Sequence, residues 1–279
     1  MGRQTLGVED RLAGPLFEVQ NVRYCYERVV ALDGATLTLP AGLRLALLGA
    51  NGSGKSTLLR LLDALYFAES GAVRFEGETL TEERFDDESF EFDFRRRVGM
   101  VFQNPDVQLF NPSVFDEVAF GPLQLRWPAA EIRKRVEATL EGLQITHLKD
   151  RAPHRLSGGE KKRVAIASVL ILDPQVLLLD EPTAALDPQS QSQMIETISG
   201  WKDSGRTVVT ATHDLNILEE IADHCFVFRA GRVAAEGTPA EILDNEELLR
   251  QTGLLHSHRH IHKSGEVHSH PHRHHDHRF

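Results

Sequence analysis

Apolar positions in this chain alternate with polar ones at first and later recur at helical spacing. Residues 17–23 and 31–39 alternate, which is typical of half-buried strands. Residues 43–48 are mostly apolar and lead into a glycine-rich segment, and residues 56–66 then have helical spacing. The beginning of the chain therefore predicts a strand, a loop and a helix in direct succession.

The middle of the chain changes from strand patterns to helix patterns. An antiparallel strand is predicted at 72–78, and an apolar strand at 98–102 ends next to Gln103. Residues 76–93 are strongly acidic and interleaved with phenylalanines, so we expect a solvated edge there. Residues 104–173 predict a helical lobe. Its clearest helices are expected at 128–143 and 164–172.

Strand patterns return after the lobe and alternate with helices. They occur at 176–179, 207–211 and 225–229. This alternation predicts an α/β fold with a mostly parallel sheet covered on both faces, next to an antiparallel β subdomain. The expected organisation is a leader at 1–16, one domain at 17–255 that contains the lobe, and a histidine-rich tail at 256–279.

Composition limits the classes of protein that this chain can represent. Its 279 residues are 41% hydrophobic, which is enough for one large α/β domain. A formal net charge of −10 argues against nucleic acid as a partner. No apolar run approaches the roughly 18 residues that span a bilayer, and the N-terminus lacks the apolar core of a signal peptide. We therefore expect any membrane role to act through partner subunits.

The glycine-rich segment GANGSGKS, residues 49–56, fits the phosphate-loop pattern G-x-x-x-x-G-K-[ST]. Its glycines let successive N–H groups point at phosphate oxygens, and the following helix contributes its positive dipole end. Lys55 is expected to contact the β- and γ-phosphates, and the Ser56 hydroxyl to ligate Mg²⁺. The predicted nucleotide-binding residues of this segment are Gly49, Ala50, Asn51, Gly52, Ser53, Gly54, Lys55, Ser56 and Thr57.

Two adjacent acids, Asp180 and Glu181, lie at the end of the apolar segment VLLLDEP. Ligands of open α/β sheets bind at the carboxyl ends of the strands. Because adjacent strand residues point in opposite directions, we expect the two acids to have different roles. Asp180 is predicted to hold Mg²⁺ through its water shell, and Glu181 to orient and deprotonate the attacking water.

With LSGGE at 156–160 between these two motifs, the chain resembles the ATPase subunits of ATP-binding-cassette (ABC) transporters over residues 17–253. The resemblance implies ATP and Mg²⁺ as cofactors, and two ATP molecules buried between two head-to-tail subunits, here a homodimer. It implies that Tyr26, or alternatively Tyr24, stacks on adenine. The other implied residues are Gln103 as sensor and Mg²⁺ ligand, Ser157, Gly158 and Gly159 as signature loop, Asp187 as D-loop aspartate, and His213 as switch histidine.

The segments FQNPDVQLF (102–110), VFDEVAFGP (114–122) and LSGGEKKRVAIA are similar to those of energy-coupling-factor importers, closest to the cobalt and nickel branch. This similarity implies an ATPase located peripherally at the cytoplasmic face of the cell membrane. The implied partners are a transmembrane coupling subunit, contacted by residues 103–110, and a small membrane protein that captures the substrate. The cargo implied in this way is Ni²⁺ or Co²⁺.

The tail contains ten histidines, mostly at i, i+2 spacing. Neutral imidazole is the commonest transition-metal ligand, and a flexible tail could fold several rings around Ni²⁺, Co²⁺, Zn²⁺ or Cu²⁺. A pH-responsive or merely solvated tail is the alternative. The candidate metal-ligating residues are His256, His258, His260, His262, His268, His270, His272, His274, His275 and His277.

Three other functions remain open on the sequence. An importer of the same type could carry a vitamin or zinc. A soluble ABC ATPase of DNA repair or translation usually has coiled coils, zinc modules or two cassettes, and this chain has one cassette and no heptads. A metal store or chaperone built on the tail would not need a complete set of hydrolysis motifs.

Overall fold

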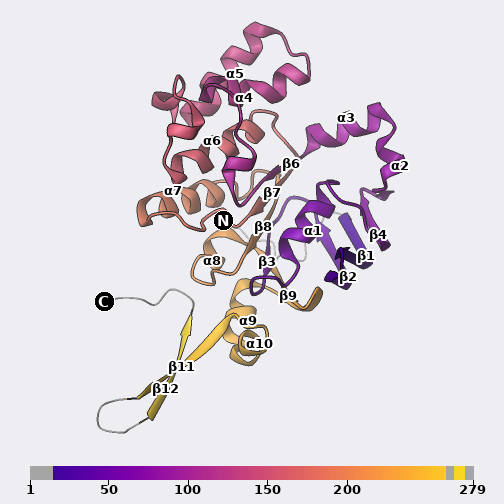
Figure 1. Cartoon of the computed structure of the whole chain (residues 1–279), viewed down its shortest axis with the longest axis vertical. Helices are drawn as coiled ribbons and strands as arrows, with labels where there is room; N and C mark the ends of the chain where they lie inside the picture. The colour runs from indigo at the N-terminus through magenta and orange to yellow at the C-terminus, as the bar shows by residue number, and fades with distance from the viewer. Residues whose placement is uncertain (1–14, 262–266, 274–279) are drawn as a thin grey trace, which may run out of the picture.

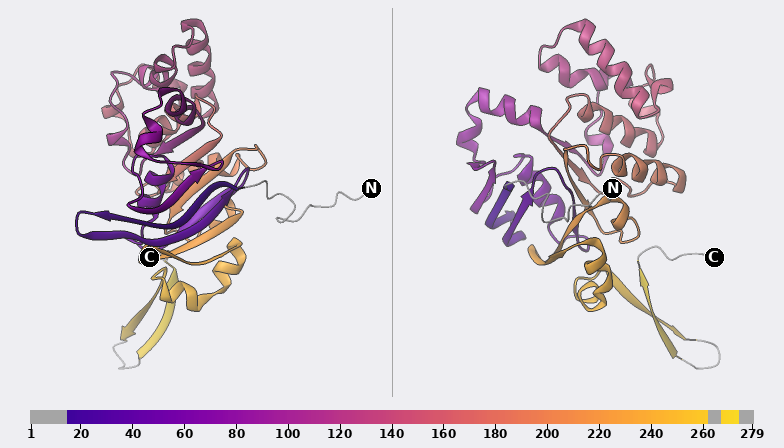
Figure 2. Two further views of the ribbon diagram at one scale, coloured as in Figure 1. Left: turned by 90° about the vertical axis from the view of Figure 1, so that its right-hand side faces the viewer. Right: turned by 180° about the vertical axis from the view of Figure 1, so that it is seen from behind.

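Three β-sheets and a helical lobe make up the part of the chain that this computed structural model describes, residues 15–261 and 267–273 (Figure 1). The lobe lies at one end of the molecule, the two larger sheets form the middle, and a β-hairpin projects from the other end (Figures 1 and 2). No helix in this described part is long and apolar enough to cross a membrane.

The first sheet is antiparallel, with the strand order β2-β1-β4-β5. It confirms the predicted antiparallel β subdomain, although β1 already begins at Pro15, inside the expected leader. The rest of the leader, residues 1–14, lies outside the described residues. The strands are β1 (Pro15–Tyr26), β2 (Val29–Pro40), β4 (Ser70–Phe75) and β5 (Glu78–Thr79).

The second sheet is the predicted parallel sheet, with the strand order β10-β9-β3-β8-β7-β6. All its pairs are parallel except β9 with β10. Side chains alternate between two separate cores: Leu45 and Leu47 of β3 lie in one, and Ala46 and Leu48 in the other. Both faces are therefore covered, as predicted. The strands are β3 (Arg44–Leu48), β6 (Val98–Val101), β7 (Val176–Asp180), β8 (Thr207–Thr212), β9 (His224–Arg229) and β10 (Arg232–Gly237).

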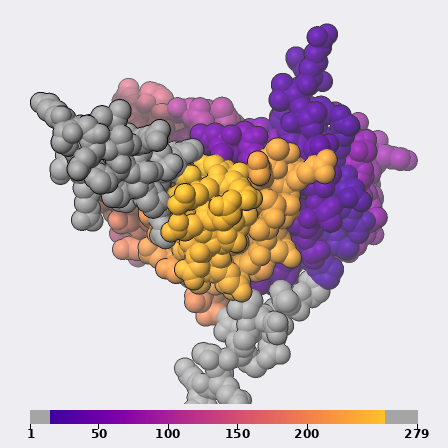
Figure 3. Space-filling model, turned by 90° about the horizontal axis from the view of Figure 1, so that it is seen from below, coloured from indigo at the N-terminus to yellow at the C-terminus, as the bar shows by residue number. Residues whose placement is uncertain are grey.

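Helices of the main body cover this sheet. One core contains buried leucines of α1 (Lys55–Leu62), and the other contains buried residues of α7 (Pro188–Ser199) and α8 (Leu218–Ile221). Two short helices, α9 (Pro239–Asp244) and α10 (Glu246–Gln251), continue the second core. Helix α9 packs against β9 and β10, and α10 packs against α9. In Figure 3, seen from below, this C-terminal part lies beside the orange later strands of the sheet.

The helical lobe has its own core, as the sequence predicted. Val118, Val136 and Val164, one from each of its main helices, are fully buried there. The buried helix expected at 164–172 begins earlier, because the LSGGE segment caps it. The lobe consists of α4 (Val114–Gln124), α5 (Ala129–Gly142) and α6 (Gly158–Leu170), with 3₁₀ turns at Pro105–Val107, Thr146–Leu148 and Pro153–Arg155.

The acidic stretch after β4 differs from the expected solvated edge. It folds into two helices, α2 (Glu82–Phe85) and α3 (Glu88–Arg97). Their carboxylates are mostly exposed, but Phe85 and Phe90 pack against the main core and Arg84 lies 4.0 Å over the Phe90 ring. The aromatic side chains therefore anchor a charged segment that composition alone predicted to be a solvated edge.

The histidine-rich tail contains an antiparallel hairpin where a flexible segment was expected. Strand β11 (Leu255–Ile261) pairs with β12 (Val267–Arg273) over seven residue pairs, from Leu255 with Arg273 to Ile261 with Val267. The strict alternation of histidine with other residues is a strand pattern of period 2, which composition obscured. Of the predicted metal-ligating histidines, His262, His274, His275 and His277 lie outside the described residues.

Candidate nucleotide-binding site

The carboxyl ends of four neighbouring strands bring the predicted catalytic segments together. β3 leads into the glycine-rich loop, β8 ends at Thr212 directly before His213, and β7 ends at Asp180. β6, the neighbour of β7, ends two residues before Gln103. Because these strands are parallel, everything that follows them emerges at one edge of the sheet, where ligands bind in this class of fold.

Two glycines let the phosphate loop curl next to the sheet. Gly49 has φ +154°, and a Cβ there would lie 2.7 Å from the carbonyl oxygen of Phe228. Gly54 has φ +110°, and a Cβ there would lie 2.7 Å from the carbonyl oxygen of Ala31. Any larger residue would push the loop away from strands that hold it in place. These contacts explain why the loop needs glycine at both positions.

Lys55 is buried in the curl of the loop, with 5% of its surface exposed. Its Nζ donates to the carbonyl oxygens of Gly49 (2.6 Å) and Ala50 (3.3 Å) and lies 3.8 Å from Oε1 of Glu181. Burial lowers the pKa of Lys55, and the carboxylates of Glu181 and Asp180 partly oppose this effect. The Ser53 Oγ is buried and has no hydrogen-bond partner within the described part of the chain. A cation and an unused hydroxyl inside a glycine loop fit a phosphate group.

Ser56 and Asp180 form a direct pair across the sheet edge. The Ser56 Oγ donates to Oδ1 of Asp180 at 2.8 Å. Burial raises the pKa of Asp180, although the hydrogen bond from Ser56 counteracts this rise. A hydroxyl next to a carboxylate is the oxygen donor set that Mg²⁺ takes together with phosphate oxygens. This pair therefore fits the metal that accompanies a nucleotide.

Glu181 and His213 form the second pair, with Oε1 and Nδ1 2.9 Å apart. Glu181 follows β7 in a left-handed conformation, φ +45°, and its N–H donates to the carbonyl oxygen of Ala211 in β8. The turn, rather than strand alternation, separates its direction from that of Asp180. The hydrogen bond with Glu181 raises the pKa of His213, and burial opposes it.

Lys162 was missed by the sequence analysis. Its Nζ donates to the carbonyl oxygens of Glu181 (2.7 Å) and Ala184 (3.0 Å), and burial lowers its pKa to about 8. Lys162, which belongs to helix α6 of the lobe, thus holds the backbone of the strained turn at Glu181 in place. A signal was present: Gly159, Lys162 and Ile166 follow helical spacing on the buried face of α6.

The two candidate adenine-stacking tyrosines belong to one aromatic cluster. The Tyr26 hydroxyl accepts from Arg60 Nη1 (3.0 Å) and from Thr57 Oγ1 (3.3 Å), so it is tied to the helix after the phosphate loop. Tyr24 stacks on Tyr66, with ring centroids 5.2 Å apart. Tyr26 therefore has the direct connection to the phosphate loop.

Among the described residues, no hydrogen bond or ion pair joins the signature segment to the phosphate loop of the same chain. Ser157 caps α6: its Oγ accepts from the N–H of Glu160, whose carboxylate accepts from the N–H of Ser157. A Cβ added at Gly158 would meet no atom within 4 Å, so this residue borders open space. Asp187 caps α7 by accepting from the N–H and hydroxyl of Ser190, and Gln103 is exposed.

Gly159 joins this segment to α7, and its replacement tests that junction. A Cβ at Gly159 would lie 2.7 Å from the Cβ of Ser190, which rotation cannot move away. We expect Gly159→Ala to reduce the free energy of unfolding by about 1–3 kcal/mol through overpacking. Gly158→Ala is the matched control, since helix propensity predicts no loss there. Urea unfolding of both variants measures the difference, and equal stabilities would contradict the contact.

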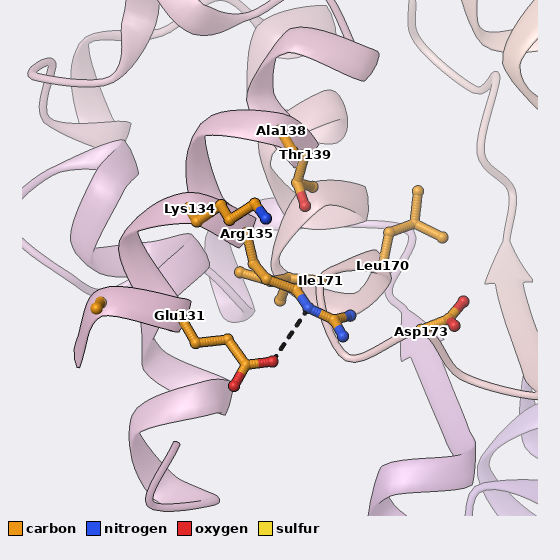
Figure 4. A pocket seen from close by; sticks show the side chains of 9 residues that line it. Glu131, Lys134, Arg135, Ala138, Thr139, Leu170, Ile171 and Asp173 are labelled. Atoms are coloured by element: carbon orange, nitrogen blue, oxygen red, sulfur yellow. Dashed lines mark ion pairs between the residues drawn. The ribbon is translucent and has the colours of Figure 1, made fainter. Parts of the chain in front are cut away.

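A separate pocket, lined by both apolar and charged side chains, lies on the lobe between α5 and the end of α6 (Figure 4). It is lined by Glu131 and Arg135, whose side chains form an ion pair at 3.6 Å, and by Asp173. None of the predicted site residues lines it. Among the described side chains no group of three or more His, Cys, Asp or Glu residues could hold a metal ion.

Comparison with known proteins gives a consistent result. Residues 32–184 match the ABC transporter family. The chain is 59% identical over 244 residues to the nickel import ATP-binding protein NikO of Rhodobacter capsulatus, covering 86% of this chain and 96% of the relative. It is 44% identical over 241 residues to the cobalt import ATP-binding protein CbiO of the same organism, covering 86% and 85%.

A solved structure shows the same architecture. CbiO1 of Clostridium perfringens, described as part of the ABC transporter complex CbiONQ, superposes with a TM-score of 0.73 at 39% sequence identity. The superposition covers 86% of this chain and 95% of that protein. The likeness therefore extends over most of this chain and nearly all of that protein.

Proposed function

Because this chain belongs to the ABC transporter family and is an ATPase coupled to transport, we propose that it powers a membrane importer of Ni²⁺ or Co²⁺. The ATPase activity in this proposal rests on one observation: five polar side chains converge at one edge of the sheet. They are Lys55, Ser56, Asp180, Glu181 and His213. The cargo half rests on relatives that are named for nickel and cobalt import.

The proposed hydrolysis assigns each polar side chain one task. Lys55 and the loop N–H groups would hold the phosphates, and Ser56 with Asp180 would hold Mg²⁺, which would neutralise negative charge on the phosphates. Glu181 accepts a proton from the attacking water, and His213, hydrogen-bonded to Glu181, positions that carboxylate next to the terminal phosphate. Gln103, which follows the end of β6, senses whether nucleotide occupies the site. Tyr26 contacts the adenine, supported by its bond to the helix of the phosphate loop.

We propose that the active unit is a head-to-tail homodimer. Among the described residues, no hydrogen bond joins Ser157 or Gly158 to the phosphate loop of the same chain, and Gly158 borders open space. The N-terminus of α6, which spans 13 residues, is a donor group suited to an anion. A second copy would bring this terminus to the nucleotide of the first, so each site would use both chains.

The coupling surface is proposed at the exposed apolar residues that follow β6. Val107 and Phe110 are 69% and 67% exposed, and Leu123 of α4 is 56% exposed. Scattered exposed apolar residues are ordinary, but here they adjoin the Gln103 segment that senses the nucleotide. We assign this surface to a transmembrane coupling subunit, with a separate membrane protein capturing the substrate. The ATPase then sits peripherally on the cytoplasmic face of the membrane.

Nickel is the favoured cargo of the two metals. One organism has both a nickel and a cobalt ATPase of this type, and this chain is 59% identical to the former and 44% to the latter. The histidine-rich tail suits the same class of cargo, because imidazole binds both ions.

Uptake of radiolabelled Ni²⁺ and Co²⁺ by cells that carry the complete complex tests the cargo. We expect the intact complex to accumulate Ni²⁺ more than Co²⁺, and the Glu181→Gln variant to accumulate neither, because import needs turnover of ATP. If cells with the intact complex and cells with the Glu181→Gln variant took up each metal equally, metal import would be refuted and a vitamin or zinc would be favoured as cargo. ATPase activity of the purified complex is measured in parallel, so that failure of the cargo and failure of the enzyme are separated.

A further inference from the structure

The register of the C-terminal hairpin places histidines opposite histidines. β11 and β12 are antiparallel, and their pairing is continuous from residue 255 to residue 261. Three of its seven pairs consist of two histidines each. These pairs are His256 with His272, His258 with His270, and His260 with His268.

The position of a residue in its strand determines on which of the two faces of the ribbon it lies. Residues directly opposite each other in an antiparallel pair share a face, and so do alternate residues along one strand. The six paired histidines are therefore on one face of the ribbon. The other face has Ser257 with Pro271, Arg259 with Ser269, and Ile261 with Val267, and so contains no histidine. Composition alone would not separate the residues in this way.

We propose that this histidine face, residues 256, 258, 260, 268, 270 and 272, is a binding site for divalent transition-metal ions. Opposite residues of an antiparallel pair have Cα atoms about 4.5 or 5.5 Å apart, and successive pairs on one face are about 6.8 Å apart. Two neighbouring pairs thus place four histidine residues next to one another in the register of the ribbon. Imidazole sets of this kind suit Ni²⁺, Co²⁺, Cu²⁺ and Zn²⁺. Use of Ni²⁺ as the probe rests on the proposed function, whereas the site itself does not.

The hairpin is attached firmly to the ATPase body. Leu254 and Leu255 are 1% and 8% exposed and belong to the core that covers the main sheet. The Thr252 hydroxyl donates to the carbonyl oxygen of Leu248 at 2.7 Å. Gly253, with φ +72°, turns so close to the phosphate loop that a Cβ there would lie 3.6 Å from the Cβ of Ala50. The ribbon then projects away from the body (Figures 1 and 2).

A rearrangement that keeps all ten tail histidines tests the face. The variant Ser257→His, His258→Ser, Ser269→His, His270→Ser moves two histidines to the other face, opposite Pro271 and Arg259. Its composition equals that of the natural chain. A disordered tail that collects metal by composition would bind Ni²⁺ equally well in both proteins. A site that depends on the register of the two strands would bind Ni²⁺ more weakly in the rearranged protein.

The experiment is equilibrium binding of Ni²⁺ to purified full-length protein, freed of metal and without ATP or membrane subunits. Loss of supporting groups outside a metal's ligands already reduces affinity about 10- to 100-fold, so we expect the rearranged variant to lose at least about tenfold. Equal affinity would overturn the histidine face. So would natural protein that binds Ni²⁺ no better than a variant with all ten tail histidines replaced by asparagine. Thermal melting verifies that each variant folds, and because no transport is measured, failure here leaves the import proposal standing.

Discussion

Replacement of Glu181 by glutamine is expected to reduce ATP turnover by about 10²- to 10⁴-fold, the usual contribution of a general base. The amide keeps the size of the side chain and can still bond Nδ1 of His213, which lies 2.9 Å from Oε1 in the native protein. It cannot accept a proton from water. Binding of ATP should persist, because in the proposed site Lys55 and the loop hold the phosphates independently of that proton. Phosphate release measures turnover, and calorimetry measures nucleotide affinity.

Glu219→Gln is a suitable control for Glu181→Gln, since Glu219 is an exposed carboxylate of α8 away from the sheet edge.

The pKa of His213 gives a second measurement on the Glu181→Gln variant. The hydrogen bond with Glu181 is the main cause of the raised pKa of His213, so the variant should lower that pKa in an NMR titration. The protonated pair stabilises the folded chain at low pH, and this contribution is lost as pH rises through the raised pKa. Normal turnover in the assembled complex would refute Glu181 as base.

Much of the nucleotide site follows from local sequence. GANGSGKS between an apolar strand and a helix can form little other than a phosphate loop, and the acids at a buried strand end must emerge at the ligand-binding edge. The order of strands in the sheet completes the site. It places β8 between β3 and β7, and thereby brings His213 to Glu181 across 32 residues of sequence.

The features that sequence reasoning missed depend on how helices pack against one another or on which face of a helix or strand a residue occupies. Lys162 acquires its role only when α6 packs against the Glu181 turn. The helices α2 and α3 had local signals, because Thr81 and Asp87 accept hydrogen bonds from N–H groups of the first turns. Their high charge outweighed those signals in a reading based on composition. The hairpin shows the same effect, since its alternation was taken as a property of histidine content.

Replacement of Lys55 by methionine is expected to abolish useful nucleotide binding. The side chain is buried, and its Nζ bonds only to loop carbonyls and to carboxylate in the described structure, an arrangement from which it can turn to phosphate. Truncation of one partner of a buried, hydrogen-bonded charge pair costs about 2–5 kcal/mol. This loss corresponds to about a 30- to 4,000-fold rise in the Kd for ATP. Calorimetric titration of purified chain with Mg·ATP measures it directly.

The matched control for Lys55→Met is Lys162→Met, because both lysines are 5% exposed and both donate to backbone carbonyls. Loss of Lys162 should lower thermal stability and loosen the Glu181 turn, while ATP affinity stays within a few-fold of the native value. The two variants thus separate the cost of deleting any buried cation from the cost of deleting the one that faces phosphate. If both raised the Kd for ATP equally, Lys55 would be a structural residue and the phosphate site would have to be placed on the loop N–H groups alone.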